Sequence, residues 1–291
     1  MIQLEGKSAI VTGAAVGIGN SYAHALAKAG VNLGICDLRE DVHALADSLK
    51  QYGVKVTSSQ GDVADPIHVR GFVDRAAADL GSIDILINNA GVCSTSSPKD
   101  DLDRTLADYD SLVGTNLKGK YLFGRAVIPI MIGQGTGGEI INIATDHIAT
   151  CGSPYFCCPK LDTCPYKDAP RPTGAGVMDI YDASQWAQNG LLYAWAKALA
   201  PHNIRVNALC MGATDSHMIR SFFGSSVTQE DIDKWMQPED IARVMIELLE
   251  EGPTGRNAQS INFCMGRPVQ LEAPHEHLYV REQQVALKVT V

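Results

Sequence analysis

The stretch from Ser8 to Gly19 reads SAIVTGAAVGIG, and it decides the fold of this chain. Its first four residues predict a short buried strand, and apolar residues at helical spacing follow the loop. In that loop Gly13 allows a tight turn, Gly17 allows the backbone to approach a ligand closely, and Gly19 allows the helix to pack on the strand. With Ile18, the loop is a candidate phosphate-binding turn, because the N–H groups and positive dipole end of a helix N-terminus attract anions.

Strands and helices continue to alternate after this turn. Strands are predicted at residues 8–11, 31–36, 54–58, 83–87, 139–143, 204–209 and 260–263, and helices at 18–29, 40–52, 66–80, 103–132, 181–199 and 238–250. Such alternation predicts right-handed βαβ units. The expected fold class is therefore α/β, a doubly wound, seven-stranded parallel sheet of the Rossmann type with helices on both faces.

Two segments, residues 146–180 and 267–291, break this alternation. The first is rich in proline and cysteine and is too long for a plain connection, so we expect a functional lid or loop. The second ends in a strand-like run, residues 285–291, which would pack on its own domain or on a neighbouring subunit. We expect a single domain over residues 1–266 with the lid inserted into it, followed by a C-terminal tail.

Composition narrows the class of protein. The chain has 291 residues, of which 45% are hydrophobic, and this is enough for one sizeable core. The formal net charge is −9 without any run of basic residues, which argues against nucleic acid and anionic membranes as partners. No apolar stretch approaches the length of a membrane span, and the N-terminus lacks the pattern of a signal peptide. We expect a cytoplasmic protein with a small-molecule substrate.

An acidic residue, Asp37, follows the second predicted strand. Its carboxylate can accept hydrogen bonds from the hydroxyls of an adenosine ribose and would repel a 2′-phosphate, which favours NAD over NADP as the cofactor. Arg39 is a weak argument for the opposite preference. The alternative role for Asp37 is that of an ordinary turn residue at the end of a strand.

Several further motifs, in the same order along the chain, resemble those of the short-chain dehydrogenase/reductase superfamily over residues 7 to about 266. Besides the glycine turn, these are Asp62-Val63, Asn88-Asn89-Ala90-Gly91, Asn116 and the segment 203–208. The resemblance implies a nicotinamide cofactor held by the glycine turn, by Asp37, by Asp62 and Val63 beside the adenine, and by Asn89, Ala90 and Gly91. Taken singly, Asn88–Gly91 could be a plain turn, and Asn116 could merely bond a neighbouring backbone.

The resemblance also implies the catalytic residues. Tyr181 would be the general acid and base, Thr145 would stand at the position of a serine that binds the substrate oxygen, and Asn116 would hold a relay water. The family has a lysine four residues after the tyrosine, and this chain has Gln185 there. The insertion before the tyrosine is also far longer than is usual in the family. Tyr155 is a rival for the tyrosine, which we reject because Pro159 soon follows it.

The glutamine at position 185 matters because a phenol has a pKa of roughly 10, about three units above neutrality. A nearby ammonium favours the phenolate, whereas a neutral amide brings no full charge. In the oxidation direction the positive nicotinamide ring of NAD could help. Lys160 and Lys167, in the insertion, are the candidates nearest in sequence for a substitute cation.

A second departure lies in the loop that follows the sixth predicted strand. The family's Pro-Gly pair is Met211-Gly212 in this chain, and Thr214 follows it. The resemblance implies that Gly212 and Thr214 contact the nicotinamide carboxamide. The alternative role for Thr214 is that of a helix N-cap.

The remaining candidates point to packing and assembly. We expect Cys36, Cys93, Cys210 and Cys264 to be small buried apolar residues. The spacing of Cys151, Cys157, Cys158 and Cys164 suits zinc poorly, and His275 and His277 read as part of a solvated tail, so no metal is predicted. Trp186 and Trp195 are expected in the core or at a subunit contact. By resemblance, the chain forms a homo-oligomer, a dimer or tetramer.

The leading hypothesis is an NAD(H)-dependent oxidoreductase that interconverts a secondary alcohol and a ketone. Gln185 leaves two alternatives open: an isomerase, dehydratase or lyase on the same scaffold, or a non-catalytic NAD-binding sensor. Turnover of a panel of alcohols discriminates the first hypothesis from the other two.

Overall fold

The structure is a computed structural model, which describes residues 2–97, 99–148, 178–224 and 227–274. Its centre is a seven-stranded sheet with the order β3-β2-β1-β4-β5-β6-β7, and every neighbouring pair is parallel. The strands are β1 (Ser8–Thr12), β2 (Asn32–Asp37), β3 (Val56–Gln60), β4 (Ile85–Asn88), β5 (Gly138–Thr145), β6 (Ile204–Met211) and β7 (Ser260–Phe263). The predicted fold class is confirmed.

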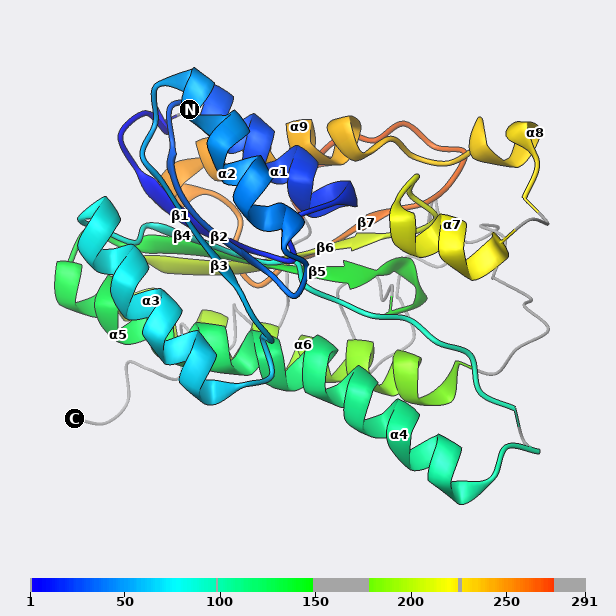
Figure 1. Ribbon diagram of the computed structural model, residues 1–291. Helices are drawn as coiled ribbons and strands as arrows, with labels where there is room; N and C mark the ends of the chain where they lie inside the picture. Colours follow the sequence, from blue (N-terminus) through cyan, green and yellow to red (C-terminus); the bar gives the residue numbers. More distant parts are fainter. Residues whose placement is uncertain (1, 98, 149–177, 225–226, 275–291) are drawn as a thin grey trace, which may run out of the picture.

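Helices cover both faces of this sheet (Figure 1). One face carries α1 (Gly17–Lys28), α2 (Asp41–Leu49) and α9 (Pro238–Glu250). The other carries α3 (Pro66–Leu80), α4 (Leu102–Val113), α5 (Lys120–Gln134) and α6 (Asp179–Leu199). Two short helices, α7 (His217–Phe223) and α8 (Gln229–Ile232), lie beyond the carboxyl end of β6.

The core has two apolar layers, one between the sheet and each set of helices. Along β1, Ala9 and Val11 belong to the layer under α1 and α9, whereas Ile10 belongs to the layer under α3, α5 and α6. Every residue of β1 is buried, as expected for a parallel strand that is covered on both sides. This burial explains why the strands read as short apolar runs rather than as alternating patterns.

The long helix predicted at residues 103–132 is present, but its middle is π-helical. The helical run continues without a break from α4 through a π-helical turn at Gly114–Gly119 into α5. Inside the turn, Asn116 is fully buried and its side chain bonds the backbone of Val92. A Cβ on Gly119 would lie 2.7 Å from Val63, so the chain packs too tightly here for most residues. Periodicity cannot detect such a turn, because only one extra residue is inserted.

Other predicted boundaries differ by a few residues, and α7 and α8 were not predicted. The helix expected to run to residue 52 ends its α-helical part at Leu49 and continues as a 3-10 turn, Lys50–Tyr52, before Gly53 in the left-handed conformation. Residues 149–177 of the predicted lid and 275–291 of the tail lie outside the described residues. None of the helices within the described ranges is both long and apolar enough to cross a membrane.

Candidate active site

The glycine turn joins β1 to α1 and has no room for a side chain at Gly13 or at Gly19. Gly13 and Gly17 have φ values of 64° and 60°, which most L-residues avoid. A Cβ on Gly13 would lie 2.7 Å from the Ala90 backbone, and one on Gly19 would lie 2.1 Å from the Gly13 carbonyl oxygen. The turn is thus a bare backbone cradle at a helix N-terminus, which suits a pyrophosphate.

Asn89 and Thr12 fix the conformation of this turn through hydrogen bonds. The Thr12 hydroxyl oxygen accepts hydrogen bonds from the backbone N–H groups of Asn89 and Ala90, both at 3.0 Å. The Asn89 amide donates to the carbonyl oxygens of Thr12 at 3.0 Å and Gly13 at 2.8 Å. The structure therefore brings the Asn88–Gly91 segment and the glycine turn together, and it gives Asn89 a role in the shape of the turn.

Asp37 ends β2 beside the same turn and is nearly buried. One carboxylate oxygen accepts a hydrogen bond from the Ala15 backbone N–H at 2.9 Å, and the other accepts one from the Arg39 backbone N–H at 2.9 Å. Each oxygen keeps a lone pair for a ribose hydroxyl. The Arg39 guanidinium is engaged elsewhere, since its Nε donates to Asp41 at 2.9 Å.

The proposed adenine-side pair lies at the end of the neighbouring strand, β3. Asp62 accepts a hydrogen bond from the Ala64 backbone N–H at 2.8 Å, which shapes the turn. Val63 is buried and packs against Gly119 of the π turn. Gly91, in turn, lies close to the Asn116 amide. The predicted contacts of these residues with a nucleotide stay predictions.

Thr145 and Tyr181 meet at the carboxyl edge of the sheet. Thr145 is the last residue of β5, and Tyr181 lies in the first turn of α6. Their side chains lie close enough for the Thr145 hydroxyl to act on the Tyr181 phenol, so the structure brings together the two residues that the resemblance named as partners. Burial raises the pKa of the Tyr181 phenol well above its ordinary value, and Thr145 only partly opposes this.

Sequence reasoning missed the polar residues that surround this phenol. Cys93, Asp182 and Asp146 lie close enough to raise the pKa of Tyr181 further. Nδ1 of His147 lies 2.8 Å from the Asp182 carboxylate, and the His147 ring packs edge-on against the Tyr181 ring at 6.0 Å between centroids. Three of these polar residues could have been identified from their positions next to the predicted pair, since Asp146 and His147 follow Thr145 and Asp182 follows Tyr181.

Asn116 lies beside this pair, but its side chain is already bonded. Its oxygen accepts from the Val92 N–H at 2.9 Å, and its nitrogen donates to the Val92 carbonyl at 3.0 Å and to Ser184 Oγ at 3.1 Å. The alternative reading, that Asn116 bonds a neighbouring backbone, describes this geometry. A role of its side chain in holding a relay water stays a prediction.

Gln185 lies one helical turn after Tyr181 and is buried. Its carbonyl oxygen accepts a hydrogen bond of 2.6 Å from the amide of Gln188, which is also buried. Lys160 and Lys167, the substitute cations considered from the sequence, lie outside the described residues.

The loop after β6 closes the site from the other side. A Cβ on Gly212 would lie 2.6 Å from the Asp146 carboxylate, so a larger residue would disturb Asp146. Thr214 is buried, and its hydroxyl donates to the Gly212 carbonyl at 3.1 Å. The N-cap of α7 is Ser216, which bonds the Ile219 N–H, so the alternative role of Thr214 as that cap is wrong.

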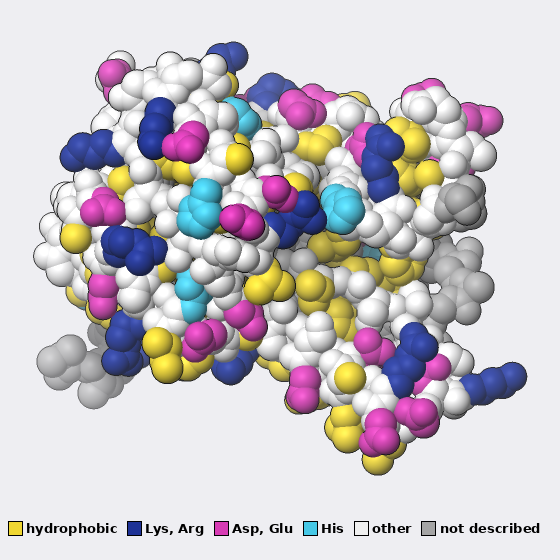
Figure 2. All heavy atoms as spheres, viewed as in Figure 1, with side chains coloured by type: hydrophobic (Ala, Val, Ile, Leu, Met, Phe, Trp, Pro, Cys, Tyr) yellow, Lys and Arg dark blue, Asp and Glu magenta, His cyan; other side chains and the backbone are white. Residues whose placement is uncertain are grey.

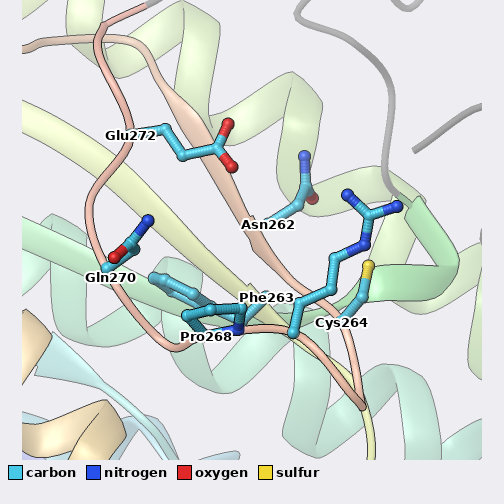
Figure 3. A pocket seen from close by; sticks show the side chains of 7 residues that line it. Asn262, Phe263, Cys264, Pro268, Gln270 and Glu272 are labelled. Carbon is cyan, nitrogen blue, oxygen red and sulfur yellow. The ribbon is translucent and has the colours of Figure 1, made fainter. Parts of the chain in front are cut away.

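The carboxyl edge of the sheet borders a recess. Figure 2 shows a hollow between α7 and α4 in which hydrophobic side chains gather. In open α/β sheets this edge is where ligands bind. A separate small cavity of about 170 Å³ lies beyond β7 (Figure 3). It is smaller than pockets that hold drug-sized ligands, and it is lined by Asn262, Phe263, Cys264, Arg267, Pro268, Gln270 and Glu272.

The cysteine prediction holds only in part. Cys36 and Cys210 are buried as expected, but Cys93 and Cys264 are partly exposed, because both lie in loops beyond strand ends. Within the described ranges, no cluster of His, Cys, Asp or Glu could hold a metal ion, and the four cysteines of the insertion lie outside those ranges. Trp195 is buried, whereas Trp186 is exposed.

Comparison with known proteins identifies the family. The family model described as short chain dehydrogenase matches residues 7–155, which is half of the chain. The chain belongs to the short-chain dehydrogenase family. A second model, described as Enoyl-(Acyl carrier protein) reductase, matches residues 172–266. Membership makes the chain an oxidoreductase that acts on small molecules, and it implies a nicotinamide cofactor.

Curated relatives and solved structures agree with this assignment. Oxidoreductase UcpA of Escherichia coli is 31% identical over 90% of this chain and 86% of its own length. The 3beta-hydroxysteroid dehydrogenase 2 of Eggerthella lenta is 31% identical over 74% of each chain. A putative short-chain alcohol dehydrogenase from Sinorhizobium meliloti superposes with a TM-score of 0.72 at 26% identity, covering 90% of this chain and 96% of the other.

Proposed function

We propose that this protein is an NAD(H)-dependent oxidoreductase that interconverts a secondary alcohol and a ketone. The observation that carries the proposal is the proximity of the Thr145 hydroxyl to the Tyr181 phenol at the carboxyl edge of the sheet, close enough to lower the pKa of the phenol. A substrate oxygen that is held by both hydroxyls can exchange a proton with the phenol directly.

The cofactor would be held by the bare cradle of the glycine turn, by Asp37 and by the loops at Asn89–Gly91 and Gly212–Thr214. Backbone N–H groups at the N-terminus of α1 would bind the phosphates, and the free lone pairs of Asp37 would bind the ribose hydroxyls. When bound, the nicotinamide supplies the two-electron redox chemistry. NAD is favoured over NADP because the Asp37 carboxylate would repel a 2′-phosphate, and because Arg39 is engaged with Asp41.

The side chains of Thr145 and Tyr181 would then bind the substrate oxygen and transfer the proton. Thr145 Oγ1 binds the oxygen, and Tyr181 Oη gives a proton to it in the reduction direction and takes one from it in the oxidation direction. Because burial raises the pKa of Tyr181, the phenol is protonated at neutral pH. We therefore expect ketone reduction to be favoured at neutral pH, and oxidation of the alcohol to need alkaline pH.

Turnover tests this function. A panel of linear and cyclic secondary alcohols and ketones, including a 3-hydroxysteroid because one relative is named for that substrate, is followed by the absorbance of reduced nicotinamide. Replacing Tyr181→Phe should lower kcat by about 100-fold or more, the usual contribution of a general acid. The affinity for NADH, measured by calorimetry, should stay within about twofold. Wild-type protein that binds NADH but converts no member of the panel would contradict the proposal.

A further inference from the structure

A buried lysine lies between β5 and α6, the two elements that carry Thr145 and Tyr181. Lys120 opens α5 directly after the π turn, and its side chain is only 3% exposed. Its Nζ donates hydrogen bonds to the backbone oxygen of Ile143 in β5 and, at 2.8 Å, to the side-chain amide oxygen of Gln188 in α6. A fully buried ammonium without a carboxylate partner is costly to the fold, and lysines are almost never buried in this way.

The surroundings of Lys120 do not supply that carboxylate. In the described part of the chain, the ionisable neighbour that acts on Lys120 is the Cys210 thiol of β6. Burial raises the pKa of this thiol to about 12, so it is uncharged at neutral pH. The groups that face Lys120 from α6 and β5 are the Gln188 amide and the Ile143 carbonyl, both neutral. No described side chain therefore balances the charge that Lys120 carries in its protonated form.

Two hydrogen bonds connect this ammonium to position 185. Lys120 donates to the oxygen of Gln188, and Gln188 Nε2 donates to the oxygen of Gln185 at 2.6 Å. A lysine ammonium has only donors, so it fixes the Gln188 oxygen inward, and the Gln188 NH₂ in turn fixes the Gln185 oxygen inward. Among the described residues, Gln188 is the hydrogen-bond partner of the Gln185 side chain, and it engages the oxygen and neither N–H group.

These N–H groups belong to the residue one turn after Tyr181, on the same face of α6. We propose that Lys120 is a positioning residue that acts through Gln188 to hold the Gln185 amide with its N–H groups toward the catalytic site, and that its buried ammonium replaces the one expected at position 185. The donors would serve the ribose of the nucleotide beside the phenol. This inference rests on the proposed function, because it assumes a nicotinamide nucleotide at that edge of the sheet.

The distance between the Lys120 ammonium and the Gln185 N–H groups limits how much the charge can change NADH affinity or the acidity of Tyr181. Two hydrogen bonds and two amide groups separate Nζ from the outer N–H of Gln185, roughly 10 Å, and at an effective dielectric constant of about 20 a charge at that distance changes an affinity or an acidity by about tenfold. The orientation of Gln185 adds one correctly directed hydrogen bond, which contributes a factor of about five.

We call the two hydrogen bonds from Lys120 through Gln188 to Gln185 the relay. The experiment uses two variants that break this relay at different points. Lys120→Met removes the ammonium, and Gln188→Leu removes the middle amide but leaves Lys120. Gln188→Leu should weaken NADH binding about fivefold by calorimetry, Lys120→Met should weaken it at least about tenfold, and the double variant should bind no more weakly than Lys120→Met alone. The matched control is Lys118→Met, an exposed lysine in the same segment, which should bind as the wild type does.

A pH series and a rescue variant separate this role from a structural one. Burial lowers the pKa of Lys120 to about 7, so NADH affinity of the wild type should fall severalfold between pH 6 and pH 9. The affinity of Lys120→Met should not share this fall. Lys120→Met/Gln185→Lys, which moves the charge beside Tyr181, should recover affinity, and its alkaline oxidation limb should move to lower pH than that of Lys120→Met.

Three results would overturn the relay. These are unchanged NADH affinity in folded Lys120→Met or Gln188→Leu, additive losses in the double variant, or a wild-type pH dependence that persists without Lys120. If Lys120→Met does not fold, Gln188→Leu alone decides the matter through its NADH affinity. The binding measurements need no substrate. A wild-type protein that binds NADH but turns over no alcohol would therefore contradict the proposed function, while the NADH affinities of the variants would still test the relay.

Discussion

Replacement of Lys120 by methionine should change the pH dependence of stability in a predictable way. Burial lowers the pKa of Lys120 from its ordinary 10.5 to about 7 in the folded chain. Between these two values the unfolded chain holds a proton that the folded chain has lost, so the free energy of unfolding rises with pH. Below about pH 7 the full penalty is present, and above about pH 10.5 it has vanished.

The magnitude follows from the pKa difference. With one pKa unit equal to about 1.4 kcal/mol, the contribution of Lys120 to the free energy of unfolding should rise by about 2 kcal/mol between pH 7 and pH 9. Methionine has no charge and a similar unbranched shape, so the variant lacks this rise. It also removes the hydrogen bonds that Lys120 donates to the Ile143 and Gln188 oxygens, but that cost does not depend on pH.

Urea unfolding of both proteins at pH 7 and pH 9 measures this effect. The free energy difference between wild type and Lys120→Met should shift by about 2 kcal/mol in favour of the wild type at the higher pH. Other groups that titrate in this range cancel in the comparison, and Lys118→Met, which changes an exposed lysine, should give the same difference at both pH values. An unchanged difference for Lys120→Met would refute the reasoning that Lys120 is buried as a costly ammonium.

Three further predictions concern the cofactor turn and the fold. Replacing Asp37→Ser should reduce the preference for NAD over NADP by about tenfold or more in calorimetric titrations, because the repulsion of a 2′-phosphate is lost; wild-type protein that binds NADP as tightly as NAD would contradict this. Gly19→Ala would place a Cβ 2.1 Å from the Gly13 carbonyl oxygen, so NADH affinity should fall at least tenfold or the chain should lose stability; a variant that folds and binds normally would count against the turn. Arg205→Met removes a buried guanidinium that donates to Glu139 at 2.7 Å, and it should lower the free energy of unfolding by about 3 kcal/mol, since Glu139, whose pKa burial already raises to about 8, loses the partner that favours its charged form; a loss below about 1 kcal/mol in urea unfolding would show that the pair contributes little.

Local sequence determined much of the architecture, because its signals are short in range. The apolar run before Gly13 and the helical spacing after Gly19 indicate strand, turn and helix without any tertiary knowledge, and the parallel sheet follows from strict alternation. Thr145 and Tyr181 could be paired by resemblance, and the structure places them close enough for Thr145 to lower the pKa of the phenol. Helix α3 was predicted with its observed bounds, since Pro66 and Gly81 mark its ends.

Tertiary structure alone decided the electrostatics of the site. Gln185 is four residues from Tyr181 in sequence, so its missing charge is visible there, but Lys120 is 65 positions earlier and reads as one more lysine near a helix start. Only the packing of α5 and α6 over β5 brings its Nζ to Gln188 and, within the described residues, leaves it without a carboxylate partner. Burial and partners set the charge of a side chain, and neither can be read from the periodicity that predicts the fold.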